Sequence, residues 1–154
     1  MQAIQSSANI ILETVFNDAS FIELINTASR AGYSTSLSVL FLDSIDQSLK
    51  RVALRAVKQT GLLISDGNVK LNFNESFKNV SEFYFYFNRV EFIYTGTDSL
   101  NQFIMSFKHD ELEMYHTNQL NFIRQFASYG LSRGRIDEVA YKVITKNENY
   151  NLDT

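Results

Sequence analysis

The stretch that most constrains the fold is residues 82–95, with the sequence EFYFYFNRVEFIYT. It is the densest run of aromatic and β-branched residues in the chain, and such residues fit the pleated, half-buried surface of a sheet. It therefore predicts one long strand, or a hairpin if Asn88-Arg89 forms a tight turn. Both faces would be apolar, so helices or another chain must cover them. The side chains expected to contact a partner are Phe83, Tyr84, Phe85, Tyr86, Phe87, Phe92 and Tyr94.

A second strand signal lies at residues 62–73. A short apolar run leads into Asp66-Gly67, and Val69, Leu71 and Phe73 then alternate with polar residues. This pattern is typical of a β-hairpin. The predicted fold class is α+β, with a small antiparallel sheet made of the 62–73 hairpin and the 82–95 strand, packed by N-terminal and C-terminal helices.

Apolar residues recur at helical spacing in several other segments. Ser44 followed by Gln47 has the pattern of a capping box, and Gly32 is placed to end the preceding helix. Residues 34–43 fit either a buried helix or a buried strand. The last segment, 136–144, also allows a strand. The expected helices cover residues 4–16, 18–31, 44–60, 99–107, 112–130 and 136–144.

Length and composition narrow the class of protein. The 154 residues fit a single domain, expected at 1–146, followed by a polar tail at 147–154 that is expected to be loose. The absence of cysteine excludes disulfides, thiolate nucleophiles and Cys-ligated metals. There is no basic leader and no apolar run long enough for a membrane span, so a cytoplasmic protein without membrane contact is expected. The absence of proline and cysteine and the many asparagines suggest a phage or viral origin.

The two histidines are the only candidates for a metal site. On a helix, His109, Glu113 and His116 would share one face, and Glu113-x-x-His116 has the spacing found in carboxylate-bridged metal bundles. Those sites need a second Glu-x-x-His pair, which this chain lacks. The residues are therefore interpreted as a solvated acidic face with two ordinary histidines, and no metal or cofactor is expected.

Signatures of catalysis and of nucleotide binding are weak. The chain has no Gly-x-Ser-x-Gly motif, and neither histidine has an evident serine partner. Residues 130–135, GLSRGR, resemble a phosphate loop only in having glycines and arginines, since they lack the Gly-Lys-Ser/Thr that binds phosphate and magnesium. A non-enzymatic role is expected.

One feature points to nucleic acid. The helix expected at 44–60 leads into Gly61-Leu-Leu-Ile and the Gly67 hairpin, which resembles the end of a winged-helix domain, with the hairpin as the wing. Residues 28–34 resemble the first helix and turn of a helix-turn-helix. The stretch between Arg30 and Lys50, which would be the recognition helix, has no Lys or Arg to read bases or phosphates. The expected nucleic-acid contacts are Lys50, Arg51, Arg55 and Lys58, which cluster on the exposed side of the helix expected at 44–60.

The sequence thus favours a non-enzymatic structural or interaction subunit of a larger assembly, which buries aromatic surface against copies of itself or a protein partner. The alternative is a winged-helix-like accessory protein that binds nucleic acid or regulates transcription. A net charge of −3 provides no overall basic field for that second role.

Overall fold

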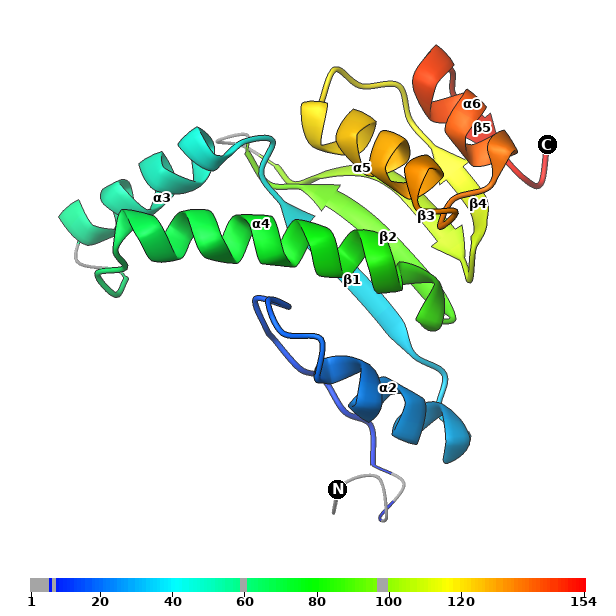
Figure 1. The fold of residues 1–154 in the computed structure, drawn as a ribbon, viewed down its shortest axis with the longest axis horizontal. Coiled ribbons are helices and arrows are strands. Elements are labelled where there is room, and N and C mark those ends of the chain that lie inside the picture. The colour runs from blue at the N-terminus through cyan, green and yellow to red at the C-terminus, as the bar shows by residue number, and fades with distance from the viewer. Residues whose placement is uncertain (1–5, 7, 59–60, 97–99) are drawn as a thin grey trace.

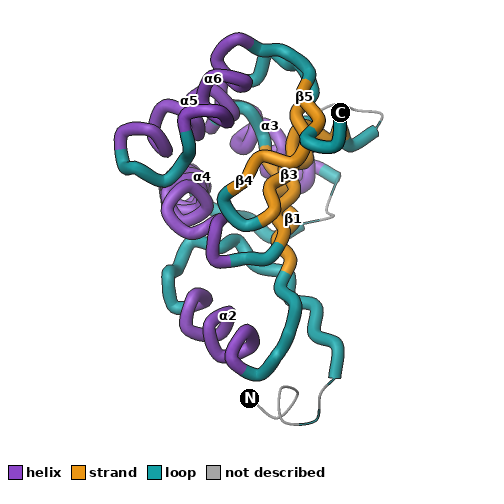
Figure 2. Tube along the Cα trace, turned by 90° about the vertical axis from the view of Figure 1, so that its right-hand side faces the viewer, coloured by secondary structure: helices purple, strands orange, loops and turns teal. Residues whose placement is uncertain are grey.

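The protein folds as one mixed β-sheet with helices packed on one of its faces (Figures 1 and 2). The computed structural model describes residues 6, 8–58, 61–96 and 100–154. The predicted α+β class is confirmed. The elements in this part of the chain are α2 (Phe21–Arg30), β1 (Ser36–Phe41), α3 (Ile45–Val57), α4 (Asp66–Phe83), the 3-10 helix η1 (Tyr84–Tyr86), β2 (Arg89–Tyr94), β3 (Gln102–Lys108), β4 (Glu111–Tyr115), α5 (Asn121–Ser132), α6 (Glu138–Lys146) and β5 (Tyr150–Asn151).

The strand order is β1-β2-β3-β4-β5, with β1 parallel to β2 and the remaining neighbours antiparallel. A parallel pair cannot be joined by a tight turn and needs a long crossover. Here α3 and α4 together form that crossover: they lie between β1 and β2 in the sequence, whereas the two strands are neighbours in the sheet.

The core lies between the sheet and the helices α4, α5 and α6, which Figure 2 shows on one side of the strands. Alternate residues of β2 point inward, so Val90 and Phe92 are fully buried. The ring of Phe92 packs 4.9 Å from that of Phe126 on α5, and Tyr84 packs 4.9 Å from Phe107 on β3.

The hairpin predicted at 62–73 is wrong, because α4 begins at Asp66. The hydroxyl of Ser65 accepts a hydrogen bond from the Asn68 N–H (3.3 Å) and caps the helix, as serine commonly does. Val69 is buried whereas Leu71 is 56% exposed. In a strand these two side chains would share a face, so their opposite environments follow from helical geometry.

The long aromatic strand predicted at 82–95 is also wrong, and so is the hairpin turning at Asn88-Arg89. Residues 82–83 end α4, residues 84–86 form η1, and only Arg89–Tyr94 is strand. The side chain of Asn88 accepts a hydrogen bond from the Thr35 N–H (2.7 Å) and so joins the start of β2 to the start of β1.

The other helix predictions had mixed outcomes. The helices expected at 18–31, 44–60 and 136–144 correspond to α2, α3 and α6. The segment 34–43, for which the sequence allows either a helix or a strand, contains β1. The helix expected at 99–107 is wrong, because β3 occupies this segment. The helix expected at 112–130 is wrong in its first part, where β4 lies, and is confirmed from residue 121, where α5 begins. No helix forms in residues 8–16; residues 4, 5, 7, 59, 60 and 99 of the expected helices lie outside the described part of the chain.

Local signals at helix ends were more reliable. The Gln47 N–H donates to the Ser44 Oγ (3.2 Å), as the capping pattern predicts, while the Gln47 side chain accepts from the N–H of Asp43 rather than of Ser44. Gly32 follows α2 with a φ of 85°, which suits glycine. The tail is more ordered than expected, because Tyr150 and Asn151 pair with β4.

Candidate functional site: an exposed apolar arm

The α3–α4 crossover projects beyond the sheet (Figure 1). We call residues 45–73 the arm: α3, the connection after it, and the first two turns of α4. The helix α3 packs mainly against α4 and has no buried residue, although its apolar residues recur at helical spacing. Its apolar residues are at most partly buried, and Leu54 and Val57 are exposed, which leaves apolar surface available for another protein.

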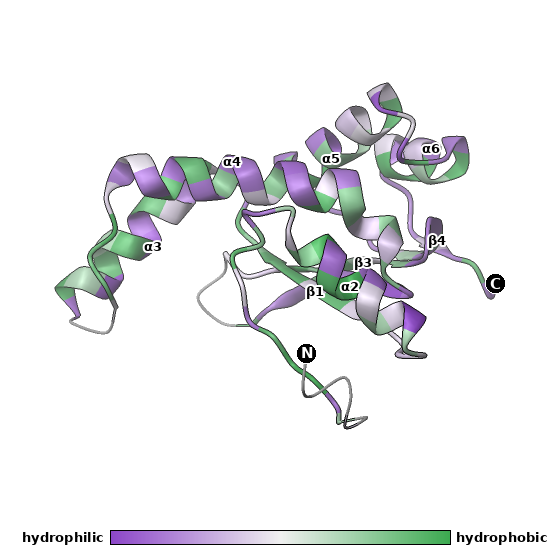
Figure 3. Ribbon diagram, turned by 60° about the horizontal axis from the view of Figure 1, so that its bottom comes forward, coloured by the Kyte–Doolittle hydropathy of each residue, from purple (hydrophilic) through white to green (hydrophobic). Residues whose placement is uncertain are grey.

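The outer end of the arm is apolar and exposed. Val57, Leu62 and Leu63 are 82%, 85% and 90% exposed, so they give almost nothing to the core of the protomer. Figure 3 shows hydrophobic residues along the connection between the two helices. Single exposed leucines are common on protein surfaces, but a contiguous group of this kind usually marks an interaction site. The exposed apolar side chains of the arm are Leu54, Val57, Leu62, Leu63, Ile64 and Leu71.

A groove of about 820 Å³ lies at the base of the arm. Val52 of α3, Phe73 and Phe77 of α4, and Phe41 of β1 contribute apolar walls, and Val15 lies at its N-terminal side. The groove continues the apolar surface of the arm toward the sheet.

The arm is basic although the chain as a whole is acidic. It contains five basic and two acidic residues, whereas the rest of the chain contains nine basic and fifteen acidic residues. The formal charge is therefore +3 for the arm and −6 for the remainder. Arg51 has a fixed position, because its guanidinium donates to the hydroxyl (2.9 Å) and the carbonyl oxygen of Thr95. The basic residues of the arm are Lys50, Arg51, Arg55, Lys58 and Lys70.

The aromatic residues predicted to contact a partner lie mostly inside the protomer. Tyr84, Phe87, Phe92 and Tyr94 are each less than 10% exposed and belong to the core, so they present no surface for docking. The aromatic surface still accessible in this stretch comes from Phe83, Phe85 and Tyr86 around η1, of which Tyr86 is exposed.

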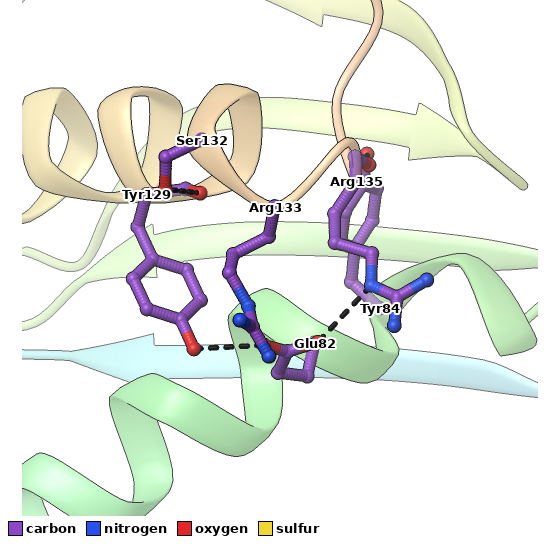
Figure 4. Close-up of polar contacts among 6 residues, drawn as sticks. All are labelled: Glu82, Tyr84, Tyr129, Ser132, Arg133 and Arg135. Atoms are coloured by element: carbon purple, nitrogen blue, oxygen red, sulfur yellow. Dashed lines mark hydrogen bonds and ion pairs between the residues drawn. The ribbon is translucent and has the colours of Figure 1, made fainter.

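Four polar side chains meet where α4 ends, and sequence reasoning missed this cluster (Figure 4). Oε1 of Glu82 accepts hydrogen bonds from the Tyr129 hydroxyl (2.8 Å) and the Arg133 Nε (2.9 Å). Oε2 accepts from the Arg135 Nε (3.0 Å). The two arginines lie in the GLSRGR segment that was compared with a phosphate loop, and here they bind a carboxylate of the chain itself.

The hydrogen bond from Tyr129 is the largest cause that lowers the pKa of Glu82 to about 2, with Arg133 and Arg135 adding to it. Burial acts in the opposite direction but is outweighed. The carboxylate is thus held ionised by three donors of the chain itself. The cluster therefore fastens α4 to the end of α5, which makes it structural.

The histidine region does not form the helical face that was considered for a metal. His109 lies in the turn between β3 and β4 with a φ of 56°, Glu113 lies on β4, and His116 follows that strand. Glu113 instead accepts from the Ser106 hydroxyl (2.8 Å) and pairs with Arg89 (3.3 Å). Among the described residues, no group of three or more His, Cys, Asp or Glu is arranged to hold a metal ion.

The winged-helix resemblance fails at the wing, because α4 occupies the place of the hairpin. Lys50, Arg51 and Arg55 lie on α3, and Lys58 is the residue that caps its C-terminal end. The signal that could have revealed the arm is Leu62-Leu63-Ile64, an apolar run next to a glycine that fits neither the helix before it nor the helix after it.

No described helix is both long and apolar enough to cross a bilayer. Comparison with protein-family models, with curated proteins and with solved structures found no match.

Proposed function

We propose that this chain is a non-enzymatic interaction subunit of a larger assembly and that the arm is the surface through which it docks. The observation that carries this proposal is the exposure of Val57, Leu62 and Leu63 at the end of the arm. Covering one such side chain contributes about 1.5–3 kcal/mol. An exposed group of them is costly to maintain unless it has a partner.

The construction of the arm supports the same role. Its helices are needed to connect β1 with β2, but a crossover of this kind normally packs on the sheet. Here the outer part extends past the sheet and contributes little to the core (Figure 1). The polar cluster at Glu82, by contrast, binds its carboxylate with three donors of the fold itself, so we assign docking to the exposed apolar surface of the arm.

This proposal changes the surface that the sequence suggested. The aromatic stretch mainly builds the core, and docking is assigned to aliphatic side chains of the arm, with Phe83, Phe85 and Tyr86 as a smaller exposed aromatic area. The phage or viral origin is a prediction from composition alone, and nothing in the proposal depends on it.

Site-specific photo-crosslinking tests the proposal. Benzoylphenylalanine is placed at Leu63, and as a matched control at Gln125, an exposed polar position on α5. The cells that make the protein are then irradiated. We expect a discrete adduct from position 63 and none from position 125. If position 63 gives no more adduct than position 125, the arm is not a docking surface and the proposal fails.

A further inference from the structure

We infer that the arm binds a second copy of this chain and that it docks on the N-terminal segment, residues 8–16, of that copy. This inference rests on the proposed function and names its partner. It is argued from the conformation of the N-terminal segment, from its exposed side chains and from its charge.

The N-terminal segment is irregular but fixed at both ends. The Tyr33 hydroxyl donates to the carbonyl oxygen of Ala8 (3.0 Å). At the other end Phe16 is buried, and the Asn79 side chain donates to the Phe16 carbonyl oxygen (3.0 Å). Figure 1 shows the segment in dark blue below α4. A segment held in this way loses little further freedom when a partner binds, which favours affinity.

The side chains between these anchors divide into two sets. Ile10, Leu12, Thr14 and Phe16 line a cavity with α2 and the start of β1, although Phe16 is buried whereas Ile10 and Leu12 are 40% and 56% exposed. Ile11 is 96% exposed, and Glu13 is exposed as well. The second set gives the segment an apolar and acidic outer surface.

The charge of the segment complements that of the arm. Residues 8–16 contain one charged residue, Glu13, and no Lys or Arg occurs before Arg30, whereas the arm carries a formal charge of +3. Contact between the arms of two copies would bring like charges together, while contact between the arm and the N-terminal segment brings opposite charges together. Charge thus favours contact of the arm with the N-terminal segment of the other copy over contact between two arms.

Two copies related by a two-fold axis can make this contact twice, since each has one arm and one segment. A stable interface needs about 1,200–2,000 Å² of buried surface in total. Making the contact twice halves the area that each arm must bury. The contact proposed is therefore Leu62 and Leu63 of one copy against Ile11 of the other, with Lys58 facing Glu13.

Sedimentation velocity of the full chain tests this inference at concentrations from about 1 to about 500 µM, a range that brackets a micromolar Kd. We expect reversible self-association of the wild-type protein. The arm variant Leu62→Ser/Leu63→Ser and the segment variant Ile11→Ser should each weaken it about tenfold or more, because each removes exposed apolar surface from the contact. Val139→Ser, at an exposed apolar position on α6, is the matched control and should leave it unchanged.

Mixing the arm variant with the segment variant adds a test of the pairing itself. In the mixed dimer the intact arm of one protein meets the intact segment of the other, so association should recover relative to either variant alone. Association that the segment variant does not affect would show arm-to-arm contact or another interface, and would overturn the inference. Glu13→Lys, which should also weaken association, gives a second variant of the segment that removes no apolar side chain.

Failure of this inference is distinguishable from failure of the proposed function. A protein that stays monomeric over the whole concentration range overturns the second copy as partner. The crosslink from Leu63 tests the wider proposal separately. In a protein that does self-associate, an adduct with the mass of two chains supports both proposals. An adduct with a different protein supports only the proposed function, and no adduct removes both.

Discussion

The Nε atom of Arg133 lies 2.9 Å from Oε1 of Glu82, and this pair joins the residue after α5 to the last turn of α4. The carboxylate is nearly buried, whereas the arginine side chain is more than half exposed. Since Tyr129 and Arg135 bind the same carboxylate, a single side chain holds three residues of the α5 end in place.

We expect Glu82→Gln to destabilise the fold by about 2–3 kcal/mol, because each of its three hydrogen bonds contributes up to about 1.5–3 kcal/mol and the exposure of the two arginines lowers the total well below the sum. Urea unfolding at pH 7 measures the change. Glu138→Gln is the matched control, since Glu138 pairs with Lys142 on the exposed surface of α6, and it should change stability by less than about 0.5 kcal/mol. Equal effects of the two substitutions would contradict the structural role of Glu82.

The same carboxylate predicts how stability depends on pH. The pKa of Glu82 is lowered to about 2 in the folded protein, below its usual value of 4.5. A lowered folded-state pKa stabilises the protein above the unfolded pKa, and this contribution is lost as pH falls through the folded pKa. The stability difference between wild type and Glu82→Gln should therefore be constant above pH about 5 and shrink steadily toward pH about 2. A difference that does not change over this range would show that Glu82 is not held ionised.

Tyr84 offers a test of the core around η1. Its ring is fully buried and its hydroxyl donates to the carbonyl oxygen of Arg135 (2.6 Å). Tyr84→Phe keeps the ring but leaves that carbonyl without this donor, so we expect a loss of about 1–2 kcal/mol in the free energy of unfolding. Tyr86→Phe, at an exposed position two residues away, should have almost no effect. Similar changes in both variants would place Tyr84 outside the core.

The segment 66–73 distinguishes a helix from the hairpin that its sequence suggests. In α4, Val69 faces the core and Leu71 faces solvent. Val69→Ser should therefore cost about 1–3 kcal/mol, whereas Leu71→Ser should be close to neutral. In a hairpin both substitutions would fall on one face and act alike. Urea unfolding of the two variants makes this comparison, and equal losses would argue against the helix.

The outcome at this segment shows why part of the fold could not be predicted. Asp66-Gly67 followed by alternating apolar residues is a strong local hairpin signal, yet Val69, Phe73 and Phe77 also recur at the spacing of a helix face. The hairpin pattern and the helix pattern both fit residues 66–73, the first eight residues of α4. Contacts with α5, where Phe77 packs 5.2 Å from Phe122, decide between them, and such distant contacts are not visible in a local pattern.

The error at β3 has a different cause. Ile104 and Met105 are adjacent and both are buried, and the pairing with β2 and with β4 shifts at β-bulges. A bulge changes the alternation of inward and outward side chains, so the apolar residues of this segment do not recur at every second position, which is the pattern that identifies a strand. Helix ends were predicted better, as at Ser44, because a cap depends on two or three neighbouring residues. The apolar run Leu62-Leu63-Ile64 is a local signal for the arm, but the exposure of this run could not be predicted, because it depends on where the sheet ends.

The last prediction concerns the nucleic-acid alternative, which depends on Lys50, Arg51, Arg55 and Lys58. If all four contacted phosphates, the logarithm of the affinity for duplex DNA would fall with the logarithm of salt concentration with a slope of about −3.6. Arg51 is already fixed to Thr95, and α4 occupies the segment that would form a wing and add contacts. We therefore expect no appreciable binding of a labelled random duplex, measured by fluorescence anisotropy between about 50 and about 200 mM salt. Binding with a slope near −3.6, reduced to about half in Lys50→Ala/Lys58→Ala, would instead establish the basic face of α3 as a nucleic-acid site, since each lost phosphate contact removes about 0.9 from the slope.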